Sequence, residues 1–300
     1  MRFSARAGFV GIVVFASAHC QAEVFTPPAP SAEVFQGISL EGTPVADKYK
    51  AAFAECDKTH SGEGMFDSQC GTPNSTRPGP NPNNNTTFIK LANGTIVFDA
   101  RMSVDAAGSP YAIKHKVSPD NPNTTLTYAD GRTPLNGEKV RYVVIPGPSR
   151  KDPTVTFMKE TGTGLGDVAA IVYDGKVTYA IVGDTSPFHR IGEASMAVND
   201  ALGHTSCKRM AANGICAQPV NDSVTKDVVY LIFPGTRAEL CGGASPSASP
   251  SSPNQSSRLC PGVTADNIND RLDTVGEAAF KKLKGAGQAG AGNTAGAAAD

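Results

Sequence analysis

A strongly signalled β-hairpin constrains the fold of this chain more than any other segment. Residues 168–173 and 176–182 form two β-type runs on either side of Asp174-Gly175, a dipeptide typical of a two-residue type I′ turn. Because such a turn sets the strand register, it predicts four cross-strand pairs. They are Tyr173 with Lys176, Ile171 with Thr178, Ala169 with Ala180 and Asp167 with Val182.

Side-chain alternation divides this hairpin into two faces. One face is apolar throughout, so other structure must cover it; it holds Val168, Ala170, Val172, Val177, Tyr179 and Ile181. The other face is expected to be half open and to end in Asp167 and Asp184 at the mouth of the hairpin. These two carboxylates would be diagonal neighbours, roughly 7–8 Å apart at the backbone. Paired carboxylates on such a face indicate acid/base chemistry.

Glu193 follows Asp184 by nine positions and is expected to open a short helix. The apolar residues of that helix recur at helical spacing: Ala194, Ala197, Val198, Ala201 and Leu202. Gly203 then ends the helix. The loop over residues 185–192 is long enough to fold Glu193 back toward the hairpin mouth.

The first 22 residues read as a secretory signal, because Arg2 and Arg6 precede an apolar run over 7–18 and small residues end the segment. That run is too short to span a membrane, and we expect no membrane partner. Without these two arginines, 25 basic residues (27 − 2) face 28 acidic ones, a formal charge of about −3. This balance argues against a nucleic-acid partner. Acceptor sequences for N-glycans fit secretion; they are Asn74, Asn84, Asn85, Asn93, Asn123, Asn221 and Asn254.

Cysteine usage also favours an extracellular protein. Cys20 leaves with the signal, and the six that remain are Cys56, Cys70, Cys207, Cys216, Cys241 and Cys260. Fifteen connectivities are possible; the economical pairs are Cys207 with Cys216 and Cys241 with Cys260. A zinc site is the competing interpretation, but the chain has no Cys-x-x-Cys pair and its histidines are scattered. No metal or organic cofactor is implied.

The chain is expected to contain one catalytic domain. The predicted segments are a signal peptide (1–22), an N-terminal extension and loop with a short helix (23–85), a β-rich catalytic domain (86–240), a Ser/Pro-rich excursion (241–260), a C-terminal helix (261–284) and a disordered Gly/Ala tail (285–300). Strand candidates in the catalytic domain are residues 95–98, 139–145, 154–157, the hairpin and 228–233. The fold class is therefore mainly β with a few peripheral helices. Nothing in the sequence indicates an oligomer, and we expect a monomer.

Five sequence blocks, taken in order, resemble the fungal chitosanases of glycoside hydrolase family 75. The blocks are Leu135-Asn-Gly-Glu-Lys-Val-Arg-Tyr-Val-Val-Ile-Pro146, Gly166-Asp-Val-Ala-Ala-Ile-Val-Tyr173, Val182-Gly-Asp-Thr-Ser-Pro187, Ile191-Gly-Glu-Ala-Ser195 and Tyr230-Leu-Ile-Phe-Pro-Gly235. The resemblance spans roughly residues 99–235, and the ordered set is far more specific than any single block.

This resemblance implies a secreted endo-acting enzyme that hydrolyses the β-1,4 bonds of chitosan with inversion, using one Asp and one Glu. Those two map onto Asp184 and Glu193. By the same analogy the fold is a six-stranded barrel of the double-psi type. One stretch departs from the family pattern: an acidic run ending in Asp-Cys-Asp is expected, but Arg101 stands between Asp99 and Asp105 and the cysteine is missing.

Inverting hydrolysis needs one protonated and one ionised carboxyl. We expect Asp184 to be the acid, because the like charge of Asp167 and burial disfavour its ionised form. Glu193 at a helix N-terminus would suit the base, and the two roles could be reversed. The structural alternatives are that Asp184 only ends a strand by hydrogen-bonding loop amides and that Glu193 only favours its helix start.

Chitosan carries ammonium groups, so its subsites should present carboxylates and hydroxyls. The absence of Trp fits this expectation. The candidate substrate-binding residues are Asp99, Asp105, Asp167 and Tyr173. Two other functions stay open: a non-hydrolytic, expansin-like carbohydrate-binding or wall-loosening barrel, and a lytic enzyme acting on peptidoglycan.

Overall fold

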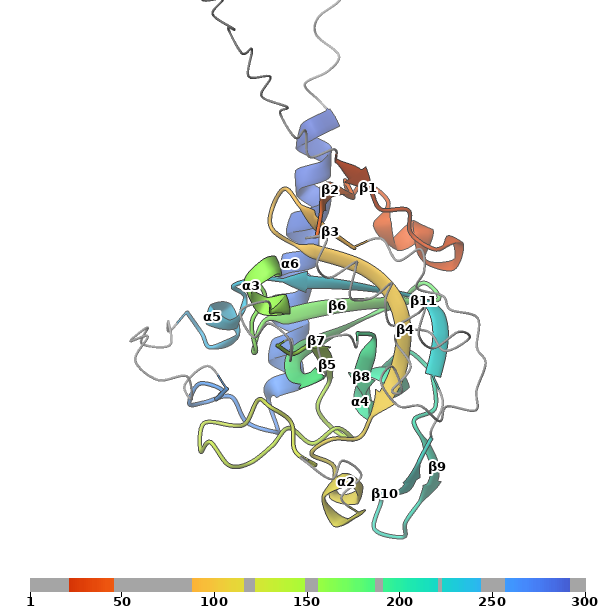
Figure 1. Ribbon diagram of the computed structural model, residues 1–300, viewed down its shortest axis with the longest axis vertical. Coiled ribbons are helices and arrows are strands. Elements are labelled where there is room, and N and C mark those ends of the chain that lie inside the picture. The colour runs from red at the N-terminus through yellow and green to blue at the C-terminus, as the bar shows by residue number, and fades with distance from the viewer. Residues whose placement is uncertain are drawn as a thin grey trace, which may run out of the picture.

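The structure is a computed structural model, and it describes residues 22–45, 88–115, 122–148, 156–186, 191–220, 223–243 and 257–291 (Figure 1). The strands are β1 (Glu23–Val24), β2 (Glu41–Pro44), β3 (Phe88–Leu91), β4 (Ile96–Asp105), β5 (Tyr142–Pro146), β6 (Val168–Tyr173), β7 (Lys176–Ser186), β8 (Glu193–Ser195), β9 (Cys207–Met210), β10 (Cys216–Pro219) and β11 (Ser223–Phe233). The helices are η1 (Ala29–Phe35), α2 (Pro110–His115), α3 (Phe157–Thr161), α4 (Met196–Ala201), α5 (Arg237–Leu240) and α6 (Ile268–Ala291).

Six of these strands close into a barrel. Hydrogen-bonded neighbours follow the order β4, β11, β6, β7, β5 and β8, and β8 pairs back onto β4. The β4–β8 and β5–β7 pairs are parallel, whereas the other four are antiparallel. Closure leaves no open edge in the barrel wall. The predicted fold class, mainly β with a six-stranded barrel and a few peripheral helices, is confirmed.

Strand β4 links the barrel to a smaller extension of the sheet. Its first residues pair with β3, and its last residues, Ser103 to Asp105, pair with β8. Strands β2 and β1 continue outward from β3. Since β4 spans ten residues, it is long enough to serve both neighbours and to carry side chains to the β8 side of the barrel.

The predicted hairpin is confirmed by its turn and its register. Asp174 and Gly175 have φ angles of 49° and 73°, as a type I′ turn requires. All pairs expected within the strands are present, from Tyr173 with Lys176 to Ala169 with Ala180. At the mouth, the Val182 amide donates to the Asp167 carbonyl at 2.8 Å.

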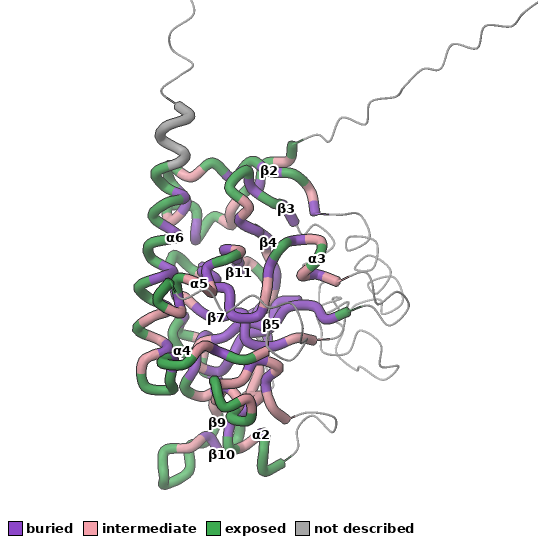
Figure 2. Tube along the Cα trace, turned by 90° about the vertical axis from the view of Figure 1, so that its left-hand side faces the viewer, coloured by how far each residue is buried: buried purple, intermediate pink, exposed green. Residues whose placement is uncertain are grey.

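Both faces of the hairpin are covered by other structure, although Val177 and Tyr179 are only half-buried. Its apolar face packs against α6, which runs along one side of the barrel (Figure 2). The face that we expected to be half open instead lines the barrel interior, where Ala169, Ile171, Ala180 and Val182 have no exposed surface. That expectation was wrong because the barrel closes through pairings far apart in the sequence, which a hairpin pattern cannot reveal.

Two helices differ from the sequence prediction. The strand predicted over residues 154–157 is not formed at its described end, because Thr156 caps helix α3 by accepting a hydrogen bond from the Lys159 amide at 3.0 Å. The C-terminal helix α6 continues past residue 284 to Ala291. Among the described helices, none is both long and apolar enough to cross a lipid bilayer.

The disulfides Cys207–Cys216 and Cys241–Cys260 are both formed. The first closes the β9–β10 hairpin, and the second joins α5 to the segment before α6. These are the two economical pairs predicted from the sequence. Cys56, Cys70, the helix expected over residues 46–56 and the Ser/Pro run over 244–253 lie outside the described residues, as does nearly all of the signal segment.

Candidate active site

A β-bulge at Gly183 decides which way Asp184 points. Val182 pairs with Val143 of β5, but the next pair joins Asp184 to Val144, so Gly183 is an extra residue. A Cβ atom on Gly183 would lie 2.7 Å from the Tyr142 Cβ, closer than side chains can approach. Because the extra residue reverses the alternation, Asp184 lies on the outer face of the barrel, whereas Val182 points inward.

Asp184 and Glu193 flank the same residue. Val144 pairs with Asp184 of β7 on one side and with Glu193 of β8 on the other. Cross-strand partners present their side chains on the same face, and two strand spacings separate these Cα atoms by about 9.5 Å. The two carboxylates therefore share one face of the barrel wall.

The carboxyl of Asp184 is anchored through one oxygen. Its Oδ1 accepts from the Thr125 amide at 2.8 Å, the Thr125 hydroxyl at 2.5 Å and the Thr185 amide at 2.8 Å. Within the described part of the chain no hydrogen bond reaches Oδ2. Burial raises the pKa of Asp184 to about 6; these hydrogen bonds oppose the rise and the nearby charge of Glu193 adds to it. Asp184 thus combines a fixed orientation with a carboxyl that holds its proton into mildly acidic pH.

Glu193 lies on a strand rather than in a helix. Helix α4 begins at Met196, and the Ser195 hydroxyl caps it by accepting from the Val198 amide at 3.3 Å. The expectation that Glu193 opens the helix was wrong, because β8 pairs with both β4 and β5 and holds residues 193–195 extended. Glu193 is buried, with 8% of the residue exposed. Strand pairing, not the helix N-terminus, positions this carboxylate.

Tyr142 lies near three carboxylates. Sequence reasoning did not identify it as a site residue. Its ring is fully buried and its hydroxyl donates to the Ala107 carbonyl at 3.0 Å. Burial raises the pKa of Tyr142 well above its usual value, and the charges of Asp105, Asp184 and Glu193 raise it further. All three carboxylates therefore surround one phenol.

Sequence reasoning also missed Thr125, whose amide and hydroxyl bind Asp184. For Tyr142 a signal existed, because it lay in a predicted strand and side-chain alternation could have placed it on the same face as Val144. For Thr125 the sequence holds no comparable signal, since the contact joins residues 59 positions apart.

The four predicted substrate-binding residues lie in different places. Asp105 lies beside Tyr142, close to the carboxylate pair. Asp99 is on the same face of β4 as Asp105, roughly 20 Å away along the strand. Tyr173 ends β6 at the turn of the hairpin, roughly 25 Å from Asp184 along β7. The structure thus brings Asp105 to the pair but leaves Tyr173 far from it.

Asp167 is not the neighbour of Asp184 that the hairpin pattern predicted. Its carboxylate accepts from the amides of Gly164 at 2.7 Å and Gly235 at 2.9 Å, and it is 4% exposed. Burial raises its pKa to about 6 against these hydrogen bonds. The bulge at Gly183 places Asp167 and Asp184 on opposite faces, so Glu193 supplies the like charge that we had assigned to Asp167.

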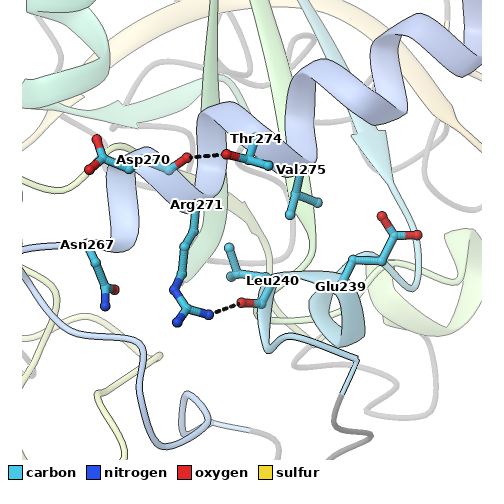
Figure 3. A pocket seen from close by; sticks show the side chains of 7 residues that line it. All are labelled: Glu239, Leu240, Asn267, Asp270, Arg271, Thr274 and Val275. Atoms are coloured by element: carbon cyan, nitrogen blue, oxygen red, sulfur yellow. Dashed lines mark hydrogen bonds between the residues drawn. The ribbon is translucent and has the colours of Figure 1, made fainter.

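A shallow pocket of about 230 Å³ lies elsewhere, between α5 and α6 (Figure 3). Arg271 crosses it and donates to the Leu240 carbonyl at 3.0 Å. The pocket contains neither carboxylate of the pair. Among the residues that the structure describes, no cluster of three His, Cys, Asp or Glu side chains could hold a metal ion.

Comparison with known proteins identifies a family whose sequence model matches this chain. The family model of the fungal chitosanase of glycosyl hydrolase group 75 matches residues 79–255, more than half of the chain. This range contains the whole barrel and both carboxylates of the pair. A search of curated proteins finds no match. Among solved structures, the Streptomyces papain inhibitor (SPI) matches with 14% identity over 46% of this chain and 94% of that chain, at a TM-score of 0.25.

Proposed function

The chain belongs to the fungal chitosanases of glycosyl hydrolase group 75, and from this membership we propose that it is a secreted endo-chitosanase that cleaves β-1,4 bonds with inversion. The family match supports a glycoside hydrolase acting on chitosan. The single observation that supports the mechanism is the position of Asp184 and Glu193 on either side of Val144.

The spacing of the two carboxylates favours inversion. Inverting glycosidases hold their carboxyl groups about 6.5–9.5 Å apart to leave room for water, whereas retaining enzymes hold them about 5–5.5 Å apart. Residues on adjacent strands would suit the shorter distance. Here a whole strand intervenes, which supports the wider arrangement.

The surroundings of Asp184 suit a general acid. A pKa of about 6 keeps a large fraction protonated at mildly acidic pH, where chitosan is also soluble and cationic. In the proposed reaction Asp184 gives its proton to the glycosidic oxygen as the bond to the anomeric carbon breaks. The proton is placed on Oδ2, since the hydrogen bonds from the described residues all end on Oδ1.

Glu193 then acts as the general base. It takes a proton from the water that attacks the anomeric carbon from the opposite side of the sugar. One proton leaves Asp184 and one reaches Glu193 in each turnover, so exchange with solvent restores the pair. No metal ion or organic cofactor takes part in this proposal.

The outer face of β4 is the proposed path of the polysaccharide. This face carries Asp99, Arg101, Ser103 and Asp105 in that order, and Ser103 pairs with Glu193. Carboxylates at the two ends of the row would bind the ammonium groups of glucosamine units. Secretion is proposed from the leader over residues 1–22, and the two disulfides agree with an oxidising compartment.

The test measures new reducing ends and loss of viscosity together on chitosan, chitin, cellulose and peptidoglycan. An endo-chitosanase should thin chitosan long before many reducing ends form, and proton NMR of fresh products should show the α-anomer first. Asp184→Asn and Glu193→Gln should each lower kcat by about 10³-fold or more, in the range seen when an essential acid or base is removed.

Glu277→Gln on α6 is the matched control, because Glu277 is half exposed and forms an ion pair with Lys281 at 2.7 Å. It should leave activity unchanged. A wild-type protein that releases nothing from chitosan would refute the proposed function, and β-anomeric first products would refute inversion.

A further inference from the structure

Arg101 lies on the proposed substrate face, next to the strand that carries Glu193. Side chains alternate along β4, so Arg101 shares a face with Asp99 and Ser103. Ser103 pairs directly with Glu193 across the β4–β8 ladder. The Arg101 guanidinium donates from Nη2 to the Ser103 hydroxyl. The cation is therefore directed toward the residue that neighbours Glu193.

The main chain of Arg101 also contacts the residue before Glu193. Gly192 has a φ of 82°, and a Cβ atom there would lie 2.6 Å from the Arg101 carbonyl oxygen. The Ser103 amide donates to the Gly192 carbonyl at 2.8 Å. Only a glycine permits this approach, and it fixes where β8 begins relative to Arg101.

Tyr230 reaches the same place from inside the barrel. Its hydroxyl donates to the Arg101 carbonyl at 3.0 Å. Burial raises the pKa of Tyr230 most strongly; the charge of Arg101 acts against this rise and that of Glu193 adds to it. The guanidinium and the carboxylate are thus both close enough to one buried hydroxyl to act on it.

The other titratable groups near Glu193 are carboxyls and phenols. They are Asp184 from β7, Tyr142 from β5, Tyr230 from β11 and Asp105 from β4. Among these described neighbours Arg101 brings the sole positive charge. Attraction between opposite charges is strong in a partly buried site, so this cation can orient the carboxylate against the repulsion of Asp184.

We propose that Arg101 is the positioning residue of Glu193: its guanidinium, held by Ser103, keeps the carboxylate turned toward the attacking water. This inference rests on the proposed function, in which Glu193 is the base. It assigns a role to the residue at which this chain departs from the acidic run expected of its family.

The variants Arg101→Lys and Arg101→Met separate charge from packing. Both keep a long unbranched stem of similar size, but only Lys keeps the cation. We expect Arg101→Met to lower kcat on chitosan by about tenfold to a hundredfold, the range in which misplaced catalytic groups fall, with KM within about twofold. Arg101→Lys should recover most of the lost kcat, although both variants melt at similar temperatures.

Arg271→Met is the matched control. Arg271 is a half-buried arginine whose guanidinium binds the Leu240 carbonyl across the α5–α6 pocket (Figure 3), so its loss should lower the melting temperature and leave kcat unchanged. If Arg101→Met does not fold, Ser103→Ala replaces it. Loss of the Ser103 hydroxyl should lower kcat severalfold with KM unchanged, because it removes one hydrogen bond that orients the guanidinium.

The inference is overturned if wild-type enzyme cleaves chitosan and Arg101→Met keeps its kcat, or if Arg101→Lys is as impaired as Arg101→Met. For the replacement variant, an unchanged kcat in Ser103→Ala has the same meaning. A wild-type protein inactive on chitosan would instead show that the proposed function is wrong. The two failures are therefore distinguishable in one set of assays.

Discussion

At Asp184, burial and hydrogen bonding act on the carboxyl in opposite directions. Burial is the larger effect and raises the pKa to about 6, whereas the hydroxyl and amide of Thr125 lower it. Sequence analysis left open that Asp184 only accepts hydrogen bonds from loop amides. Two amides, those of Thr125 and Thr185, do donate to it. Because they occupy only Oδ1, they orient the carboxyl without consuming both oxygens.

Thr125→Val should raise the pKa of Asp184 above about 6, because the lost hydroxyl stabilised the charged form. A hydrogen bond to a charged group contributes about 1.5–3 kcal/mol, or roughly one pKa unit or more. Since the acid must be protonated to act, the alkaline limb of kcat/KM should move to higher pH by about one unit. Rates on chitosan between pH 4 and 8 measure this shift.

Thr127→Val is the control for this experiment. The Thr127 hydroxyl donates to the Ser257 carbonyl at 3.3 Å and does not contact Asp184. Both variants are made in a host that does not glycosylate, because Thr125 also completes the acceptor sequence at Asn123. A limb that moves to lower pH, or that moves equally in both variants, would contradict the prediction.

Azide should distinguish the base from the acid. In Glu193→Gln the space for the attacking water remains, and azide needs no base, so added azide should restore cleavage and form the α-glycosyl azide. Asp184→Asn should show no such rescue with chitosan. Mass spectrometry and NMR of the products measure both outcomes. Rescue of the Asp184 variant alone would reverse the two roles.

At the scale of elements, one extra residue in β7 creates the site. Without the bulge at Gly183, Val144 would pair with Gly183 and Asp184 would point into the barrel. The pair would then lie on opposite faces. Glu193 likewise depends on β8, a strand of only three residues held between two longer neighbours.

Gly183→Ala tests the bulge, and Gly276→Ala is its matched control. A Cβ atom would lie 2.7 Å from the Tyr142 Cβ in the first variant and 2.4 Å from the Tyr179 Cγ in the second. Both should destabilise the protein, by about 1–3 kcal/mol, in urea unfolding. Only Gly183→Ala should also lower kcat, by tenfold or more, because it displaces Asp184.

The helix position of Gly276 adds a small opposing effect, since alanine favours a helix by about 1 kcal/mol over glycine. A comparison of kcat at equal folded fraction removes this difference. Equal activity in the two variants would show that the bulge does not position the acid.

At the scale of the molecule, two buried carboxyls couple folding to pH. Asp167 and Asp184 have an ordinary pKa of 3.8 and a pKa of about 6 in the fold. The folded state therefore binds protons more tightly between these values, and stability is lost as the pH rises through about 6. Asp130, whose pKa is lowered to about 2, titrates below this window.

The free energy of unfolding should consequently be higher at pH 4 than at pH 7, by up to about 3 kcal/mol for each carboxyl. Urea unfolding at the two pH values measures it. Asp167→Asn should remove the contribution of Asp167 to this difference in unfolding free energy, because asparagine does not titrate. Equal stability at both pH values, or greater stability at pH 7, would contradict the prediction.

Local chemistry let the sequence determine the turn of the hairpin and the register next to it. A two-residue turn at Asp174-Gly175 needs positive φ at both residues, and the register follows from its length. The nearby disulfide pairs were equally accessible, because short sequence separation makes them the simplest choices. The resemblance of five ordered blocks supplied the barrel and named the two carboxylates.

Tertiary structure alone decided how those carboxylates face each other. The bulge depends on Tyr142 and Leu135, which precede Gly183 by 41 and 48 residues (183 − 142 and 183 − 135) and leave no room for a side chain there. The environment of Asp184 depends on Thr125, and the strand state of Glu193 depends on pairing with β4 and β5. Alternation along a strand predicts the face of each side chain only where strand pairing is regular. Here the contact of Gly183 with distant residues interrupts that pairing. The physical reason is that register is set locally by a turn, whereas a closed barrel sets it between strands with no turn in common.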